Sequence, residues 1–422
     1  MSASAFSIYA FARALRAGDS SRFKVTLKTD KDSEIQKAIA CARDPQSLAD
    51  YTEIRLGSKD GVAYGDYSTA LVLRALASNV KYRARIRMPS REKIINGVLQ
   101  SCRDATPLYI YRRDIASFYE SIPLAPIRSG LEMTAVLSPM ANRVLAKFLE
   151  VHCVGNTHGL PRGVSLSAVL SEYVMKEFDR DVMLIEGAYR YFRFADDIIL
   201  FSYEPIEDLD QKLEAILPDG LKLSTKAHKK SNIALPDQKD QSGYKTFEYL
   251  GYDFNLSQRI DKANSAPRNV SITIANTKVK RIKTRVILSL KAYSMTRDRA
   301  LLIDRIQYLT SNFSVRRTGL TVKGPKRTIK SGVYYNYKQC LNSEQDMTLP
   351  RYETQLNHLD AFLRSILFGP TSSFSSVVNT HLSAAQLTQL RSLSFLAGFQ
   401  VPMMARFKAD RLGVIKAVWA YV

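Results

Sequence analysis

Two short runs of β-forming residues, 191–195 and 198–201, are separated only by Asp196 and Asp197. This pattern predicts a tight β-hairpin that carries a pair of carboxylates at its tip. A third β-forming run leads into Asp114, which places another carboxylate at the end of a strand. An isolated Asp-Asp pair is more often an exposed acidic turn, but three carboxylates at neighbouring strand ends repel one another unless a cation neutralises them. We therefore expect a sheet that gathers these aspartates around divalent ions, with Mg²⁺ favoured because it prefers oxygen ligands.

The rest of the sequence places this hairpin in a chain of mixed helices and strands. Apolar residues recur with helical spacing after Ser165 and again over 356–367, and Ser383 with Gln386 forms a capping box for a further helix. Basic residues alternate with apolar or aromatic ones over 81–89, which predicts a strand with one cationic face. We expect an α+β fold in three regions, at residues 1–110, 111–257 and 258–422.

The chain is strongly basic, with 61 Lys and Arg against 40 Asp and Glu and a formal net charge of +21. Such a charge favours a polyanion as partner, although a solvated basic surface would give the same total. The distribution is more informative, because residues 276–330 hold 15 Lys and Arg against two acidic residues. Within this stretch, we expect contacts with nucleic acid from Lys278, Lys280, Arg281, Lys283 and Arg285. Binding through phosphates would depend strongly on salt.

The cysteines and the apolar runs indicate the cellular compartment in which we expect the protein. The four cysteines are far apart and form no CxxC pair, which favours reduced thiols and argues against a zinc site. No apolar run approaches the length that spans a membrane, and the N-terminus lacks the pattern of a signal peptide. We therefore expect a cytoplasmic protein without a membrane partner.

Five segments resemble, in order, motifs A to E of the reverse transcriptases. They are residues 113–123, 159–167, 190–200, 222–230 and 247–252. Any one of them is weak evidence, whereas five in the family's order are specific. The resemblance implies RNA-directed DNA polymerase activity, in which a nucleotidyltransferase adds dNTPs to a primer. It also implies a right-hand polymerase, with fingers in 1–110, a palm with an antiparallel sheet in 111–257, and a helical thumb and C-terminal region in 258–422.

The resemblance assigns the catalytic centre to the same aspartates. Asp114 and Asp196 are the implied metal ligands, with Asp197 beside them and the carbonyl of Ile115 as a further ligand. The implied cofactor is a pair of Mg²⁺ ions, with Mn²⁺ as a substitute. In such a site one ion activates the primer 3′-hydroxyl and the other stabilises the leaving pyrophosphate. The motif D lysines, any of which could protonate pyrophosphate, are Lys226, Lys229 and Lys230.

The resemblance also assigns residues to the nucleotide and the primer. Tyr119 is placed under the sugar, where its bulk would exclude a 2′-hydroxyl; a core aromatic next to Phe118 is the alternative interpretation. Arginine suits phosphate oxygens and glycine lets backbone approach a base. On these grounds the other candidates for nucleotide binding are Arg83, Arg85, Arg87, Gly159, Pro161 and Gly163. The implied primer grip is Tyr249, Leu250 and Gly251.

Some positions depart from the family's motifs. Phe194 stands where Tyr is common, and Arg162 stands where Gln is frequent. Neither change should abolish catalysis. Asp179 and Asp181 form another carboxylate pair, which we interpret as the solvated end of a helix.

Within the family, the chain most resembles the bacterial abortive-infection and "unknown group" reverse transcriptases of phage defence. Residues 331–337 and the helix expected over 356–367 resemble their helical C-terminal region. Retron enzymes are more distant, because they typically carry Val-Thr-Gly where this chain has Tyr-Leu-Gly at 249–251. Group II intron proteins are more distant because this chain has no paired Cys or His cluster. The implied partners are an RNA template, in particular a dedicated noncoding RNA, together with dNTPs and a DNA product; homo-oligomers and protein priming stay open.

Two other classes of function remain as alternatives. A basic RNA-binding scaffold with a decayed polymerase site would tolerate loss of Asp196 and Asp197, but the presence of all three motif carboxylates argues against it. An RNA-dependent RNA polymerase shares the palm, and Tyr119 argues against that class.

Overall fold

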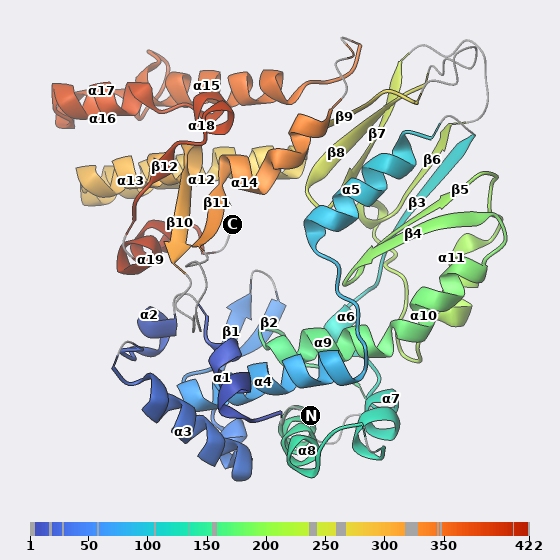
Figure 1. Cartoon of the computed structure of the whole chain (residues 1–422). Helices are drawn as coiled ribbons and strands as arrows, with labels where there is room; N and C mark the ends of the chain where they lie inside the picture. The colour runs from blue at the N-terminus through green and yellow to red at the C-terminus, as the bar shows by residue number, and fades with distance from the viewer. Residues whose placement is uncertain are drawn as a thin grey trace. The chain divides into compact units, whose positions relative to one another are not determined.

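The structure is a computed structural model of the chain (Figure 1). It describes residues 5–16, 19–27, 29–56, 59–104, 107–134, 136–153, 158–235, 243–258, 267–316, 328–343, 346, 348–407 and 409–420. The chain divides into two compact units, one of residues 1–101, 106–237 and 318–325 and one of residues 102–105, 238–317 and 326–422. Helices pack on antiparallel strands in both units, so the expected α+β fold is correct.

A four-stranded antiparallel sheet with the order β4-β5-β3-β6 forms the centre of the first unit (Figure 1). The strands are β3 (Leu108–Asp114), β4 (Ala188–Phe194), β5 (Asp197–Ser202) and β6 (Ser231–Leu235). Residues 198–201 of β5 are all buried, which is why a continuous apolar run becomes a central strand. At the edge of the sheet, β4 exposes Arg190 and Phe194.

Helices and a hairpin complete the first unit. The helices are α1 (Ile8–Ala14), α2 (Asp19–Phe23), α3 (Lys31–Arg43), α4 (Tyr67–Arg83), α5 (Arg91–Cys102), α6 (Phe118–Ser121), α7 (Ala125–Ile127), α8 (Pro139–His152), α9 (Ser165–Val174), α10 (Lys176–Asp181) and α11 (Leu209–Ile216), and the hairpin is β1 (Tyr51–Leu56) with β2 (Lys59–Tyr64). The helix predicted after Ser165 is therefore present. Its neighbour α4 is buried along most of its length, because it packs against both α3 and α9. Helix α5 lies on β4, where Gly97 leaves space for the ring of Phe192.

The strand predicted over 81–89 is wrong. Helix α4 continues to Arg83 and ends in a Schellman motif, in which the N–H of Ile86 donates to the carbonyl of Lys81 and the N–H of Arg85 to that of Tyr82. Arg85 takes the left-handed conformation that this motif requires, with a φ of 52°. The alternation of basic with apolar residues over 81–89 therefore reflects a helix end followed by an extended segment, rather than a pleated strand.

The second unit contains two small sheets and eight helices among the residues that the structure describes. Its strands are β7 (Tyr244–Tyr249), β8 (Tyr252–Ser257), β9 (Val270–Ile274), β10 (Asn312–Arg316), β11 (Thr328–Gly332) and β12 (Met404–Ala405), and its helices are α12 (Asn276–Thr296), α13 (Arg299–Thr310), α14 (Val333–Tyr337), α15 (Tyr352–Phe368), α16 (Ser375–His381), α17 (Ala384–Ser392), α18 (Phe395–Gln400) and α19 (Ala409–Ala417). The predicted apolar face of α15 is buried, and the capping box of Ser383 and Gln386 makes both of its hydrogen bonds. The sheet β11-β10-β12 was not expected from the sequence.

Two further features concern the cysteines and the length and apolar character of the helices. All four cysteines are free thiols, and three of them are buried. Within the described ranges, no helix combines the length and the apolar character needed to cross a membrane.

Candidate active site

Three aspartates meet at one end of the four-stranded sheet. Asp114 ends β3 and pairs directly with Asp197, the first residue of β5, so both side chains lie on the same face of the sheet. Asp196 stands one residue earlier, in the turn between β4 and β5, and its carbonyl accepts a hydrogen bond of 3.0 Å from the N–H of Ile115. The predicted hairpin is therefore present, but its two turn residues are Ala195 and Asp196, and Asp197 belongs to a strand.

The charges of these carboxylates are only partly compensated. Burial raises the pKa of Asp196, and the negative charges of Asp114 and Asp197 raise it further. Burial also raises the pKa of Asp197, although the guanidinium of Arg112 opposes this from 2.9 Å away. The ammonium of Lys229 donates a hydrogen bond of 2.6 Å to Oδ1 of Asp114. The site thus concentrates negative charge, and it draws cationic side chains from β3 and from the segment before β6.

This donor set fits a divalent cation by its chemistry. All side-chain donors are carboxylate oxygens, which Mg²⁺ prefers, and a bound cation would favour the charged forms that burial and mutual repulsion now disfavour. In the described part of the chain, no group of three His, Cys, Asp or Glu residues already has the geometry of a metal site. Arg112 and Lys229 hold Asp197 and Asp114 in ion pairs.

The three motif D lysines, which the sequence leaves equivalent, have different surroundings. Lys229 reaches Asp114, whereas Lys230 pairs with Asp210 and Lys226 is exposed. Burial lowers the pKa of Lys229, but the hydrogen bond and the charge of Asp114 outweigh this and raise it overall. Only Lys229 among these three therefore has an ion pair with a candidate metal ligand.

Tyr119 lies at the start of α6, half-buried between motif A and motif B. Its neighbour Phe118 is fully buried, whereas Tyr119 is partly buried and packs against the same core, so the core interpretation of Tyr119 stays open. The guanidinium of Arg162 lies 5.0 Å from the centre of the Tyr119 ring. Arg162 in turn makes two hydrogen bonds with Glu120, of 2.8 and 3.0 Å. The arginine that replaces the family's glutamine thus covers one face of the tyrosine.

The glycines of motif B are required by contacts within the protein. Gly159 and Gly163 have φ values of 103° and 94°, which favour glycine. A Cβ on Gly163 would lie 2.5 Å from the carbonyl oxygen of Val62 on β2. The turn that also contains Pro161 is further fixed by a hydrogen bond of 2.8 Å from the N–H of Val62 to the carbonyl of Arg162. The backbone therefore comes close to the hairpin of β1 and β2 at this turn.

The three candidate phosphate ligands before α5 do not share the strand that was expected to align them. Arg83, Arg85 and Arg87 are exposed on the end of α4 and on the segment after it. Arg87 lines a cavity of about 350 Å³ together with residues of α5, α9 and β4. The structure thus gives Arg87 different surroundings from the other two.

The implied primer grip is the turn of a β-hairpin in the second unit. Tyr249 pairs with Tyr252, so Leu250 and Gly251 are the two turn residues. Both have positive φ, at 47° and 79°, as a type I′ turn requires. Tyr249 is fully buried and Tyr252 donates a hydrogen bond to the carbonyl of Asn336, so the aromatic residues anchor the turn.

The five basic residues predicted to bind nucleic acid lie on α12, in the second unit. Lys280 and Arg281 are exposed, while Lys278, Lys283 and Arg285 are partly covered. The ammonium of Lys283 lies 5.2 Å from the ring centre of Phe362, and the guanidinium of Arg285 lies 5.7 Å from that of Trp419. The basic residues of the same stretch between 317 and 327 lie outside the described residues.

A buried arginine that was not predicted from the sequence lies next to the aspartates. The guanidinium of Arg193 on β4 donates to both oxygens of Glu172 on α9 and to both oxygens of Asp179 on α10. Its fifth N–H donates to the carbonyl of Ala195, at 2.9 Å. Burial would lower the pKa of Arg193, but the hydrogen bonds and charges of the carboxylates raise it well above its usual value. Asp179 is therefore an ion-pair partner. The pair of Asp179 and Asp181 does end a helix, as predicted, but Asp179 is not solvated alone, because it binds Arg193.

Arg193 fixes the turn that presents Asp196. Ala195 has a φ of 54°, a conformation that costs an alanine free energy unless neighbouring contacts hold it. The bond from Arg193 supplies such a contact, and it connects the motif C turn to the motif B helix through Glu172. A signal was present in the sequence, since a charged residue inside an apolar strand usually has a partner.

An antiparallel sheet that gathers three aspartates at one end, beside a helix and a glycine turn, is typical of the palm of nucleic-acid polymerases. Residues 67–254 match the family "Reverse transcriptase (RNA-dependent DNA polymerase)". The match covers a little under half of the chain, and it includes all three aspartates. This part of the chain is thus similar to the reverse transcriptases, whose family description names RNA-dependent DNA polymerases.

Two solved structures show a remote likeness to the chain. An apo telomerase from Candida tropicalis, truncated from its C-terminal domain, is similar over 57% of this chain and 49% of its own length, with 13% identity and a TM-score of 0.32. A telomerase from Candida albicans in complex with a fragment of telomeric RNA is similar over 86% of this chain and 61% of its own, with 11% identity and a TM-score of 0.34. The chain thus spans about half to three fifths of these proteins, and the likeness is too low to assign a function. No curated protein matches the chain.

Proposed function

We propose that this protein is a reverse transcriptase that adds dNTPs to a primer on an RNA template, with Asp114, Asp196 and Asp197 as its catalytic residues. The observation that carries the proposal is the meeting of these aspartates at one end of the β4-β5-β3-β6 sheet. The family match over residues 67–254 supports the same reaction. Fingers in 1–110, a palm in 111–257 and a thumb with the C-terminal region in 258–422 remain our proposed division by function.

Asp114 and Asp196 would hold the metal ions. Asp197, which pairs with Asp114 across the sheet, would help to position these ions. Bound there, two Mg²⁺ ions would activate the primer 3′-hydroxyl and neutralise charge on the leaving pyrophosphate. Arg112 keeps Asp197 oriented along the strand. Lys229 carries a proton on Nζ close to Asp114, so it is our choice among the motif D lysines for the general acid.

Tyr119 would select the sugar. Its ring is held between Phe118, at 5.4 Å between ring centres, and the guanidinium of Arg162. A ring fixed in this way cannot move aside to admit a 2′-hydroxyl, which favours dNTPs. Tyr119→Ala should raise incorporation of rNTPs relative to dNTPs by roughly tenfold or more. An unchanged ratio would remove Tyr119 from this role.

We further propose a role in bacterial phage defence in the cytoplasm, with a dedicated noncoding RNA as template. Support comes from the resemblance of residues 331–337 and of the Leu-rich helix α15 to the C-terminal region of defence-associated enzymes. A retron-type enzyme is the alternative within the family. A non-catalytic RNA-binding scaffold is the alternative outside it, and it would keep its function without the aspartates.

The deciding experiment sequences the nucleic acid that copurifies with the protein, before and after incubation with Mg²⁺ and labelled dNTPs. Asp196→Ala/Asp197→Ala tests catalysis, and Glu207→Ala/Asp219→Ala is its control, because it removes two exposed carboxylates elsewhere in the same unit. We expect a discrete RNA with complementary labelled DNA from the wild type and from the control only. RNA without labelled product from any variant, with dNTPs or rNTPs, would support the scaffold instead.

A further inference from the structure

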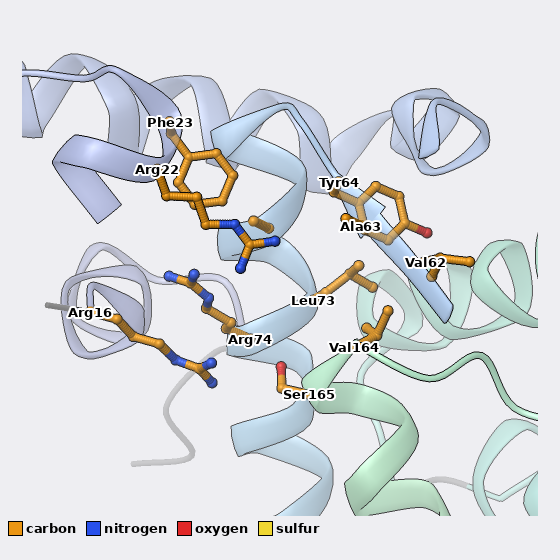
Figure 2. A pocket seen from close by; sticks show the side chains of 12 residues that line it. Arg16, Arg22, Phe23, Val62, Ala63, Tyr64, Leu73, Arg74, Val164 and Ser165 are labelled. Carbon is orange, nitrogen blue, oxygen red and sulfur yellow. The ribbon is translucent and has the colours of Figure 1, made fainter. Parts of the chain in front are cut away.

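An arginine-lined cavity lies beside the start of α9 in the first unit (Figure 2). Figure 2 shows the side chains of Arg16, Arg22 and Arg74 on one side of it and those of Tyr64 and Val164 on the other. Arg16 and Arg22 come from the N-terminal helical segment, which precedes the matched domain of residues 67–254. The cavity is therefore built partly from a segment to which the family match gives no role.

Arg74 is held rigidly at the base of the cavity. Its side chain is 9% exposed, and it makes two hydrogen bonds with the carboxylate of Asp19, of 2.7 and 3.0 Å, and one of 3.2 Å with the carbonyl of Ala14. The same carboxylate accepts bonds from the N–H of Arg16 and the hydroxyl of Tyr67. Asp19 is thus fully used in fixing Arg74 and the N-terminal segment.

Arg74 keeps hydrogen-bonding capacity for a ligand. A guanidinium has five N–H groups, and three of them are used by Asp19 and Ala14. Within the described ranges the other two have no acceptor, although the side chain is buried. Arg74 is not among the described residues with a fully buried polar atom that lacks a partner, so these donors are accessible to water or to an anion in the cavity.

The opposite end of the cavity also favours an anion. Gly163, Val164 and Ser165 line it at the N-terminus of α9, a ten-residue helix with no acidic residue in its first turn and no side-chain cap. Free N–H groups and the helix dipole there attract negative charge. The volume of the cavity is about 50 Å³. A water molecule needs about 10–15 Å³ on such a measure, so the space suits the four oxygens of one phosphate but not a nucleoside.

We propose that this cavity is a binding site for a single phosphate group, held by Arg16, Arg22 and Arg74 and by the N-terminus of α9. The phosphate could be free orthophosphate or an internucleotide phosphate of a bound RNA strand, since both present the same oxygens to arginine. The site does not depend on catalysis by the aspartates.

The test uses the full chain with Arg16→Gln/Arg22→Gln, which leaves the pair of Arg74 and Asp19 intact, and with Arg22→Gln alone as the milder variant. Arg13→Gln/Arg43→Gln is the control, because it removes the same charge from exposed positions that do not line the cavity. Thermal unfolding verifies that the variants are folded. One arm titrates orthophosphate by calorimetry, and the other titrates a short single-stranded RNA without terminal phosphates over a range of KCl concentrations.

Roughly tenfold weaker binding of orthophosphate by the cavity variant, with the control unchanged, would establish a site for free phosphate. If orthophosphate does not bind, a loss of about 0.7 or more in the salt slope of RNA binding, again only in the cavity variant, would establish an internucleotide phosphate. Equal behaviour of cavity variant and control in both arms overturns the proposal. Asp196→Ala/Asp197→Ala should bind like the wild type in both arms, so an absence of polymerase activity would not affect this result.

Discussion

Replacing Arg193 by methionine should destabilise the first unit strongly, because it leaves buried carboxylates without their cation. The side chain of Arg193 is 3% exposed and those of Glu172 and Asp179 are 15% and 37% exposed. Water can solvate Asp179 in the variant, but it reaches Glu172 poorly. Removing one partner of a buried ion pair costs about 3–5 kcal/mol, and we assign most of this to Glu172. Such a loss is a large part of the total stability of a typical domain.

The assay is urea unfolding followed by far-UV circular dichroism, with hydrogen exchange to locate the change in β4 and α9. Fluorescence of Trp419, the single tryptophan, follows the second unit in the same samples. Arg190→Met is the control, since Arg190 is exposed on the same strand and its loss should change stability by less than about 0.5 kcal/mol.

Adding Glu172→Gln to the methionine variant separates an unpaired charge from lost packing. It removes the carboxylate that Arg193 no longer neutralises, so the double variant should be more stable than Arg193→Met alone, whereas Glu172→Gln by itself should destabilise the wild type. A loss below about 1 kcal/mol for Arg193→Met would refute the reasoning, as would a double variant less stable than the single one.

Three further changes test other parts of the structure. Gly163→Ala should cost about 1–3 kcal/mol, because its φ is positive and the new Cβ meets backbone, whereas Gly65→Ala, which meets nothing within 4 Å, should be neutral; equal thermal unfolding of the two would contradict this. Lys229→Met should lower single-turnover dNTP incorporation about a hundredfold and Lys226→Met should not, unless the proton comes from elsewhere. Burial raises the pKa of Asp253 to about 6, so its ionisation lowers the stability of the second unit as pH rises from about 4 through 6. Asp253→Asn should therefore raise the urea midpoint at pH 7 by an amount equivalent to about 1–3 kcal/mol, and this gain should vanish near pH 4; a gain that is the same at both pH values would exclude Asp253 as its source.

Patterns within one strand or one helix were readable from the sequence because the signal is local. Apolar runs next to carboxylates predicted β3, β4 and β5, and helical spacing predicted α9 and α15. The strand predicted over 81–89 failed because alternation over a few residues does not distinguish a pleated strand from a Schellman motif that ends a helix. A left-handed Arg85 was not visible in advance, since arginine has no preference for that conformation.

Side-chain partners distant in the chain were decided only by tertiary structure. The sequence determined that Asp114, Asp196 and Asp197 lie next to apolar β-forming runs and that the chain is basic. It could not determine that Lys229 reaches Asp114, or that Arg193 joins Glu172, Asp179 and the turn before Asp196. Ion pairs form wherever burial makes a lone charge costly, and burial depends on which elements pack together rather than on neighbours in sequence. The same reason explains the arginine cavity, whose walls come from α4, from the start of α9 and from a segment that precedes both.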